Sequence, residues 1–244
     1  MNWVKKILFK TLGTKKYLKL ISRIYIKQIE KGKYQDKYPE LHFLRTFIKP
    51  DFYCIDIGAN LGYYSYFLCK YAYQGKVWGV EPVPVFAEVL LSNCKFAHFT
   101  LVPYALGEKN SPIYMQTPII DGIFRHGLTK VVDTNAPSSL YSYQVEMKIP
   151  NQIFNNLPRL DFVKCDVEGY EYLIFQNFME VITQHLPILQ IEIQNAQKQN
   201  MYNLLCKAGY FPYKLQNKNW VNLSYTEYLN YGRDVYFIVP QKIS

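Results

Sequence analysis

The sequence predicts an α/β domain with a mostly parallel central sheet, helices on both faces and an antiparallel C-terminal edge. From residue 52 onward, apolar runs typical of buried strands alternate with helical segments. This alternation is typical of a parallel sheet that is covered on both sides. The last two strand-like runs, 210–216 and 234–240, have no long helix between them, so we expect them to form an antiparallel pair.

Ahead of this domain we expect an N-terminal helical extension that is strongly basic. Residues 1–49 contain 13 Lys and Arg against 3 Asp and Glu, whereas residues 50–244 contain 15 against 16. The domain itself is therefore close to neutral. Because nucleic-acid-binding proteins carry a broad basic surface, no nucleic-acid partner is expected.

Two short helices are expected in the extension, at 2–12 and 15–30, separated at Gly13-Thr14. The second helix has an apolar stripe at helical spacing between its lysines, formed by Leu18, Ile21, Tyr25 and Ile29. We interpret the stripe as packing on the domain, which is the usual role of such stripes. The alternative is that residues 1–33 contact an anionic membrane surface, so that the protein is peripheral at the inner membrane face.

Cysteine usage and hydropathy indicate a cytoplasmic protein. The five cysteines are scattered, and none lies in a Cys-x-x-Cys pair, which argues against a disulfide framework and against a zinc site. No apolar stretch approaches the roughly 20 residues of a membrane span, and a signal peptide is not expected. The bias toward Lys, Asn, Ile and Tyr favours a bacterial source.

The elements of the domain are located by their hydrophobic patterns. Besides the two terminal strands, strands are predicted at 52–58, 76–82, 99–106, 161–169 and 186–193. Helices are predicted at 62–73, 84–95, 170–183 and 195–208.

Residues 107–150 interrupt this alternation. They contain several prolines and turn formers, with two short strand-like pieces, "PIYMQT" and "QVEMKI". A long insertion at such a place is typically a functional loop or a hairpin over a site, so we expect it to cover the substrate site. A tolerated surface loop is the alternative.

Acidic residues stand at the ends of the predicted parallel strands. In open parallel sheets, ligands bind at the carboxyl ends of the strands, where the strand order reverses. Each acid alone is weak evidence, but together they predict a binding site at this edge: Asp56, Glu81, Glu108, Asp166 with Glu168, and Glu192.

The turn after the first strand, "CIDIGANLGYYS", has the geometry of a phosphate-binding turn with the opposite charge. Gly58 and Gly62 frame it, but Asp56 precedes it and Glu81 ends the next strand. At about 4–6 Å these carboxylates would repel a diphosphate by an energy on the order of kcal/mol. A ligand that is cationic or rich in hydroxyl and amino donors suits the pocket better, and S-adenosylmethionine fits this description.

Four stretches, "IDIGANLGYYS", "GVEPVPVFAEVLLSNC", "VPYALGE" and "DFVKCDVEGYE", resemble the successive motifs of the FkbM family of S-adenosylmethionine-dependent methyltransferases. The resemblance covers roughly residues 50–210, and its most specific part is the Asp-x-Glu-Gly-x-Glu element. It implies a Rossmann-like class I methyltransferase fold and methyl transfer to oxygen, often on a sugar or a related secondary metabolite. Family members usually show a Leu-Asp pair where this chain reads "IPNQIF".

The resemblance also implies roles for the matching residues. Asp166 and Glu168 would face the transferring methyl group. The cofactor-binding residues would be Asp56, Gly58, Asn60 and Gly62 at the methionine end, Glu81 with Pro82 at the ribose, Ala105, Leu106 and Glu108 near the adenine, and Asp166.

A general base would accelerate methyl transfer to a sugar hydroxyl, typically by about 10²–10⁴-fold. Asp166 is the first candidate, Glu168 the next, and His126 in the insertion a third. Asp166 and Glu168 could instead cap the following helix and support the cofactor turn. Lys164 is expected to form a supporting ion pair, and Glu171 to face solvent or a helix partner.

The sequence thus predicts an S-adenosylmethionine-dependent methyltransferase that methylates a sugar hydroxyl on a glycan or glycolipid precursor, as in polysaccharide biosynthesis. Methylation of a small secondary metabolite and a non-catalytic binding protein with the same fold are alternatives. An NAD-linked oxidoreductase is disfavoured by the glycine spacing and the acidic turn. A metal-free site is favoured over a divalent ion held by Asp166 with Glu192, Gln194 or Asn195.

Overall fold

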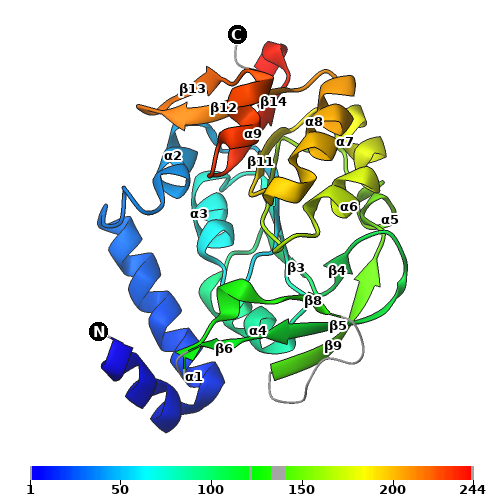
Figure 1. The fold of residues 1–244 in the computed structure, drawn as a ribbon. Helices are drawn as coiled ribbons and strands as arrows, with labels where there is room; N and C mark the ends of the chain where they lie inside the picture. The colour runs from blue at the N-terminus through cyan, green and yellow to red at the C-terminus, as the bar shows by residue number, and fades with distance from the viewer. Residues whose placement is uncertain (1, 121–122, 133–140, 243–244) are drawn as a thin grey trace.

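The computed structural model describes residues 2–120, 123–132 and 141–242 (Figure 1). An eight-stranded sheet lies at its centre, in the order β13-β12-β14-β11-β10-β1-β2-β3. Its strands are β1 (Tyr53–Ile57), β2 (Lys76–Val80), β3 (Phe99–Val102), β10 (Phe162–Cys165), β11 (Ile188–Ile191), β12 (Phe211–Gln216), β13 (Asn219–Asn222) and β14 (Val235–Ile238).

The first five of these strands pair in parallel, whereas β14, β12 and β13 pair antiparallel. The predicted α/β class with an antiparallel C-terminal edge is therefore confirmed. The chain passes from β1 to β2 and β3 on one side, and β10 and β11 lie on the other side. The strand order thus reverses between β1 and β10, where a ligand crevice is expected.

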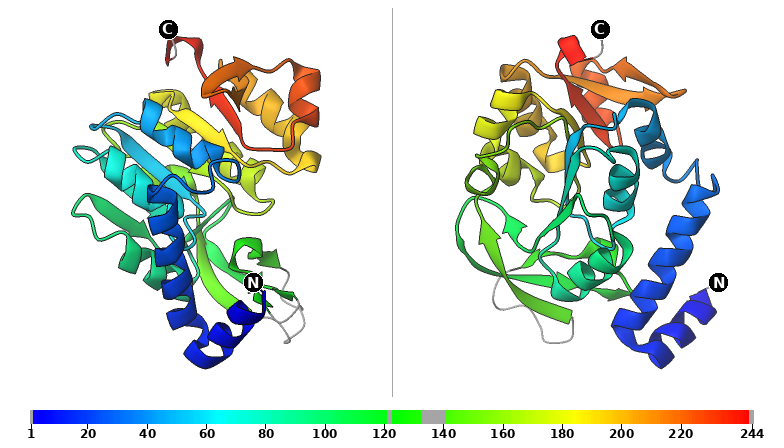
Figure 2. Two further views of the ribbon diagram at one scale, coloured as in Figure 1. Left: turned by 90° about the vertical axis from the view of Figure 1, so that its left-hand side faces the viewer. Right: turned by 180° about the vertical axis from the view of Figure 1, so that it is seen from behind.

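Helices cover both faces of the sheet (Figures 1 and 2). Alternate residues of β1 point to opposite faces: Cys54 lies in the core under α2 and α3, whereas Ile55 and Ile57 lie in the core under α6, α7 and α8. The helices are α1 (Asn2–Glu30), α2 (Pro39–Phe47), α3 (Tyr63–Tyr71), α4 (Pro84–Asn93), α5 (Pro150–Phe154), α6 (Glu171–Gln176), α7 (Met179–His185), α8 (Lys198–Lys207) and α9 (Tyr225–Asn230). Short 3₁₀ turns are η1 (His126–Leu128), η2 (Asn195–Gln197) and η3 (Pro240–Lys242).

The N-terminal extension lies along one side of the domain (Figure 2). α1 bends at Gly13, whose φ of 70° and ψ of 165° are not helical, as the predicted separation of two helices requires. Leu18 and Ile29 of the apolar stripe are buried, so the stripe packs on the domain. None of the helices in the described ranges is both long enough and apolar enough to cross a bilayer.

The insertion forms a second, four-stranded sheet in the order β4-β9-β5-β8, next to a two-stranded β6-β7 hairpin. Its strands are β4 (Ala105–Leu106), β5 (Ser111–Thr117), β6 (Ile119–Ile120), β7 (Ile123–Phe124), β8 (Lys130–Val132) and β9 (Tyr141–Lys148).

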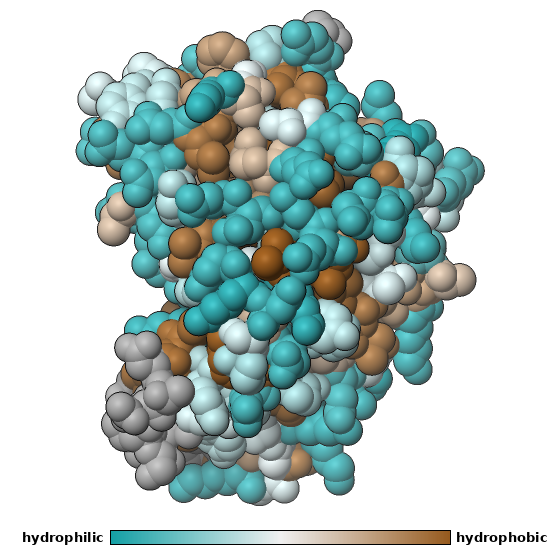
Figure 3. Space-filling model, turned by 90° about the vertical axis from the view of Figure 1, so that its right-hand side faces the viewer, coloured by the Kyte–Doolittle hydropathy of each residue, from teal (hydrophilic) through white to brown (hydrophobic). Residues whose placement is uncertain are grey.

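On the face of the molecule away from α1, hydrophilic residues predominate and apolar residues form small patches between them (Figure 3).

Two predicted elements were wrong in detail, and two further elements were not predicted. The strand predicted at 99–106 is two strands in different sheets, because residues 99–102 pair with β2 whereas residues 105–106 pair with β9 of the insertion. The helix predicted at 170–183 is divided into α6 and α7. Between β12 and β14, β13 and α9 were not predicted, although Ser224 and Glu227 form the capping box of α9, which the sequence "SYTE" could have indicated.

The turn after β1 approaches the end of β10 so closely that only glycine fits at position 58. Gly58 has a φ of +80°, and a Cβ atom there would lie 1.9 Å from the Asp166 carbonyl oxygen. The Asp166 amide donates to the Ile57 carbonyl (3.1 Å), which fixes the two loops against each other.

We therefore expect Gly58→Ala to lower the free energy of unfolding by about 2 kcal/mol or more, because it combines backbone strain with a steric clash. Urea unfolding followed by circular dichroism measures this. Gly232→Ala is the matched control, since its Cβ would meet no atom within 4 Å. A Gly58→Ala protein as stable as this control would contradict the close approach.

Candidate functional site

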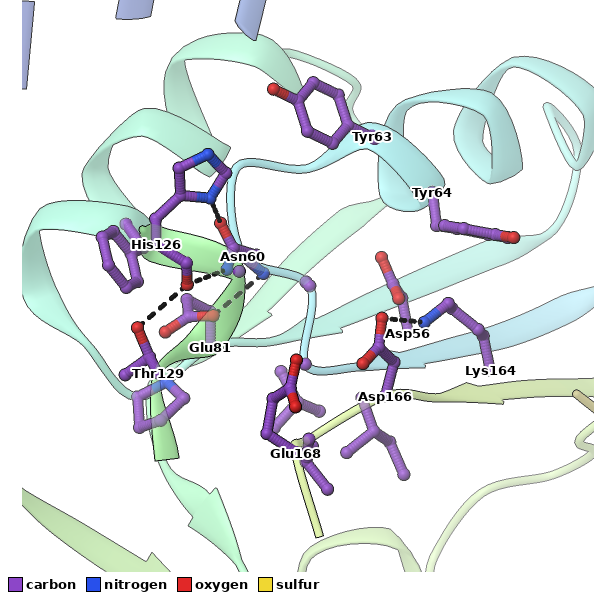
Figure 4. Close-up of a pocket in the computed structure, with 18 of the residues that line it drawn as sticks. Asp56, Asn60, Tyr63, Tyr64, Glu81, His126, Thr129, Lys164, Asp166 and Glu168 are labelled. Atoms are coloured by element: carbon purple, nitrogen blue, oxygen red, sulfur yellow. Dashed lines mark hydrogen bonds and ion pairs between the residues drawn. The ribbon is translucent and has the colours of Figure 1, made fainter. Parts of the chain in front are cut away.

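A cavity of about 310 Å³ opens where the strand order reverses (Figure 4). The carboxyl ends of β1, β2 and β10 form its floor, and the insertion and the N-terminal helices contribute to its walls. This volume lies at the lower end of the range for small-molecule sites, about 300–1,000 Å³. Most of the predicted site residues line it: Asp56, Gly58, Asn60, Glu81, Pro82, Ala105, Leu106, His126, Asp166 and Glu168.

Two predicted cofactor residues do not line this cavity. Gly62 is the N-cap of α3 with a φ of +86°, and a Cβ atom there would lie 2.6 Å from Leu90 Cδ1 of α4. Its role is therefore to let α3 and α4 approach. Glu108 is exposed and accepts a hydrogen bond from the Tyr170 hydroxyl (2.9 Å). Tyr170 does line the cavity, so Glu108 contacts a residue of the cavity wall and not the cavity itself.

Glu81 shapes the glycine turn through its carboxylate. Asn60, which has a positive φ of 50°, donates its amide to Glu81 Oε2 (2.9 Å), and the Val83 amide donates to Oε1 (2.8 Å). Burial raises the pKa of Glu81 to about 7, although these two amides lower it. Each oxygen keeps lone pairs for a further donor, so Glu81 can accept hydrogen bonds from a ligand while it holds the turn.

Asp56 offers a buried acceptor that none of the described residues uses. Its Oδ2 accepts a hydrogen bond from the Ser65 hydroxyl (2.6 Å), whereas Oδ1 has no hydrogen-bond partner among the described residues. The side chain is 1% exposed and lines the cavity. Burial raises its pKa, and the nearby Lys164 opposes that shift. An unpaired buried carboxylate oxygen is costly unless a ligand supplies a donor.

Lys164 and Asp166 form the predicted ion pair, with Nζ 3.0 Å from Oδ2. Burial lowers the pKa of Lys164, but Asp166, Asp234 and Asp56 outweigh it, so that the pKa is raised. The Lys164 ammonium also lies 4.8 Å from the centre of the Tyr64 ring. Lys164 is therefore a buried cation beside Asp166, and the predicted ion pair is confirmed.

Glu168 lies beside Asp166 in the same cavity (Figure 4). It has a positive φ of 58°, a strained backbone conformation for a residue other than glycine. Burial and then the charges of Asp166 and Glu171 raise its pKa. A carboxylate with a raised pKa is a stronger base at neutral pH. The structure therefore favours Glu168 as the candidate base more than the sequence did, which ranked it after Asp166.

His126 ties the insertion to the glycine turn. Its ring donates from Nδ1 to Asn60 Oδ1 (2.8 Å), its carbonyl accepts from Asn60 Nδ2 (2.9 Å), and Thr129 donates to the same carbonyl (2.9 Å). Figure 4 shows His126 on the Glu81 side of the cavity, away from Lys164 and Asp166. This location suits binding of a ligand at the Glu81 end better than proton transfer near Asp166.

The N-terminal helices contribute a wall that the sequence did not predict. Tyr25 and Ile29 of α1, Tyr38 at the start of α2 and Leu41 within it line the cavity. The Tyr25 ring lies 6.1 Å from that of Tyr63 on α3, so rings from both segments meet. The available signal is the apolar stripe itself, which contains Tyr25 and Ile29 and which we interpreted as packing on the domain, with membrane contact as the alternative.

A second cavity of about 320 Å³ shares Asp166 and Glu168 with the first. It contains the residues considered for a divalent ion, Glu192, Gln194 and Asn195. Within the described ranges, no three or more His, Cys, Asp or Glu side chains are grouped so that they could hold a metal ion.

The expectation that Glu171 faces solvent or a helix partner was wrong. Glu171 is 1% exposed, and its Oε1 accepts hydrogen bonds from the Gly169 and Val167 amides (3.0 and 3.3 Å). It therefore stabilises the Asp-x-Glu-Gly loop from beneath. The sequence could not show this, because the bonds depend on the turn geometry.

The raised pKa of Glu81 predicts a specific pH dependence of stability. The folded-state pKa of Glu81, about 7, exceeds the unfolded value of 4.5. The contribution of protonated Glu81 to stability is therefore fully present below pH 4.5 and is lost as the pH rises toward 7. Over this window we expect the free energy of unfolding of wild type to fall by up to about 3 kcal/mol relative to that of Glu81→Gln. Parallel urea titrations at several pH values measure the difference, and a pH-independent difference would contradict the raised pKa.

Comparison with known proteins places the chain in a family. The model of the Methyltransferase FkbM domain matches residues 56–212, and no curated protein sequence matches the chain. Among solved structures, a methyltransferase FkbM from Methylobacillus flagellatus KT is similar, with 17% identity, a TM-score of 0.49, and coverage of 78% of this chain and 44% of that one. This chain thus spans less than half of that protein.

Two further structures show comparable similarity. An S-adenosylmethionine-dependent O-methyltransferase from Thermotoga maritima has 15% identity, a TM-score of 0.46, and coverage of 88% and 71%. A precorrin-6y C5,15-methyltransferase from Geobacter metallireducens GS-15 has 13% identity, a TM-score of 0.44, and coverage of 81% and 82%. Because the family model matches more than half of the chain and includes the glycine turn and the Asp-x-Glu-Gly loop, this protein belongs to the FkbM methyltransferase family.

Proposed function

We propose that this protein transfers a methyl group from S-adenosylmethionine to a hydroxyl group of a sugar on a glycan or glycolipid precursor. The observation that carries the proposal is the buried Oδ1 of Asp56, which has no hydrogen-bond partner among the described residues. It lies beside a glycine turn, and Glu81 directly follows the next strand, β2. The described cavity lining contains four carboxylates, from Asp56, Glu81, Asp166 and Glu168, and one lysine ammonium. This charge balance favours a cationic donor over a diphosphate.

The residues present fit S-adenosylmethionine. Asp56 Oδ1 would accept from the cofactor's ammonium, and Glu81 would accept from both ribose hydroxyls. The missing side chain at Gly58 leaves the turn open to close approach. Ala105, Leu106 and Pro82 line the cavity with the insertion and would contact the adenine. The cofactor supplies a methyl group already activated on a sulfonium, so the protein mainly has to align the acceptor.

Glu168 is the group that would accept the proton of the acceptor hydroxyl, because its pKa is raised and Figure 4 shows its carboxylate in the cavity. Asp166, fixed by Lys164, would accept a hydrogen bond from the acceptor and orient it. Asp166 as the base is the second assignment. The tyrosine-rich wall of Tyr25, Tyr38 and Tyr63 would cover a ring-shaped acceptor and exclude water.

Methylation of a small secondary metabolite is the second candidate function. Ile29 and Leu41 make part of the wall apolar, which would suit a less polar acceptor. Radiolabelled methyl transfer to a panel of sugar nucleotides and glycans, compared with a panel of phenolic and aliphatic alcohols, separates the two. Transfer of the labelled methyl group only to the phenolic or aliphatic alcohols would reject a sugar acceptor in favour of a small metabolite.

Cofactor identity is tested by calorimetric titration with S-adenosylhomocysteine and with NAD. We expect heat with the former and none with the latter. Asp56→Asn should lower the affinity for S-adenosylhomocysteine by about 10–100-fold, because a neutral amide replaces the charged acceptor of the ligand's ammonium. Asp36→Asn, an exposed acid in the turn before α2, should leave the affinity unchanged. Binding of NAD in place of S-adenosylhomocysteine would reject the methyltransferase assignment of the cavity.

The base is tested by comparing Glu168→Gln with Asp166→Asn on the best acceptor of the panel. We expect Glu168→Gln to reduce kcat by about 10²–10⁴-fold with unchanged affinity for S-adenosylhomocysteine. We expect Asp166→Asn to raise KM for the acceptor more than it lowers kcat. If Asp166→Asn abolishes turnover while Glu168→Gln retains it, the two roles are reversed.

A further inference from the structure

The outer face of α1 is basic and carries exposed aliphatic side chains. Lys16, Leu20, Arg23, Ile24 and Lys27 recur at the spacing that places residues on one side of a helix. Leu20 is 38% and Ile24 is 44% exposed. The left view of Figure 2 shows α1 on the outside of the molecule, with no other drawn helix or strand across it.

This outer face differs from the stripe that the sequence singled out. Tyr17 and Leu18 are buried against α4 and Phe124, and Ile29 is buried toward α2 and α3. The packed stripe already accounts for the attachment of α1 to the domain. Leu20 and Ile24 belong to none of the hydrophobic clusters found among the described residues. Two further aliphatic residues near the bend, Ile7 (42%) and Leu12 (36%), are also exposed.

Within the described residues, most of the charges on this face have no ion-pair partner, although the charge of Lys27 contributes to lowering the pKa of Glu30. Lys15, at the edge of the face, pairs with Glu88, and Glu30 at the end of α1 pairs with Lys70. Within the described residues, no ion pair involves Lys16, Arg23 or Lys27. The exposed side chains of Lys16, Arg23 and Lys27 therefore remain available to an anionic partner.

We propose that the outer face of α1 docks the protein on an anionic lipid membrane. Basic residues that flank exposed aliphatic residues on one helical face are typical of helices at the lipid interface, where the cations meet lipid phosphates and the aliphatic groups enter the boundary layer. A nucleic acid would satisfy the charges but would leave Leu20 and Ile24 in water. The combination of charge and apolar exposure therefore favours the membrane.

Docking by this face would bring the catalytic cavity close to the bilayer. Tyr25 and Ile29, on the inner side of the same helix, line the cavity, and an α-helix with its side chains is only about 10–12 Å across. If the proposed methyltransferase function holds, this position favours an acceptor that is carried on a lipid, which is the glycolipid form of the proposed substrate.

The test is co-sedimentation of the full chain with phosphatidylcholine vesicles that contain or lack phosphatidylglycerol. We expect binding only to the anionic vesicles, and release at about 1 M salt, where the Debye length is about 3 Å. The triple variant Lys16→Glu, Arg23→Glu, Lys27→Glu should lose at least about tenfold in affinity. The variant Leu20→Ser, Ile24→Ser should also bind more weakly, which a purely electrostatic attraction would not predict.

The matched control is the triple variant Lys109→Glu, Lys207→Glu, Lys242→Glu, which changes the net charge equally at exposed sites outside the N-terminal extension. Equal loss in both triple variants, or equal pelleting with neutral vesicles, would overturn the proposal. So would binding of a labelled single-stranded RNA to wild type without any binding to anionic vesicles. Circular dichroism of every variant shows whether the fold is intact. The affinity of every variant for S-adenosylhomocysteine separates a failure of membrane docking from a failure of the methyltransferase assignment.

Discussion

The close approach of the β1 turn to the end of β10 is the constraint on which the site depends. Gly58 lies against the Asp166 carbonyl, and the Asp166 amide donates to Ile57. This contact joins the two strands between which the strand order reverses. It therefore brings the carboxylate of Asp56 on one strand and the Lys164–Asp166 pair on the other into one cavity.

The two loops are held by different buried carboxylates. Glu81 accepts the amides of Asn60 and Val83 and so shapes the first loop, whereas Glu171 accepts the amides of Val167 and Gly169 and so shapes the second. Both acids are almost completely buried, and burial raises the pKa of each. The acidic motif of this family thus has a structural part, Glu171, in addition to the residues that face the cavity.

Much of the fold could be predicted because the relevant signals are local. The apolar runs specified the parallel strands, and Asp56, Glu81 and Asp166 could be assigned to one edge because parallel strands end at the same side of a sheet. Other features depend on tertiary contacts. Neither the inward turn of Glu171 nor the link from His126 to Asn60 follows from sequence spacing. The tyrosine wall from α1 and α2 was not predicted because an apolar stripe does not show what it packs against.

The central claim is that the cavity between β1 and β10 binds S-adenosylmethionine with Asp56 and Glu81 as its polar contacts. A crystal structure of the protein with S-adenosylhomocysteine tests it most directly. The account predicts the ribose hydroxyls on the Glu81 carboxylate and the amino group on Asp56 Oδ1. Ligand density in the second cavity beside Glu192, with Asp56 Oδ1 still unpartnered, would contradict it.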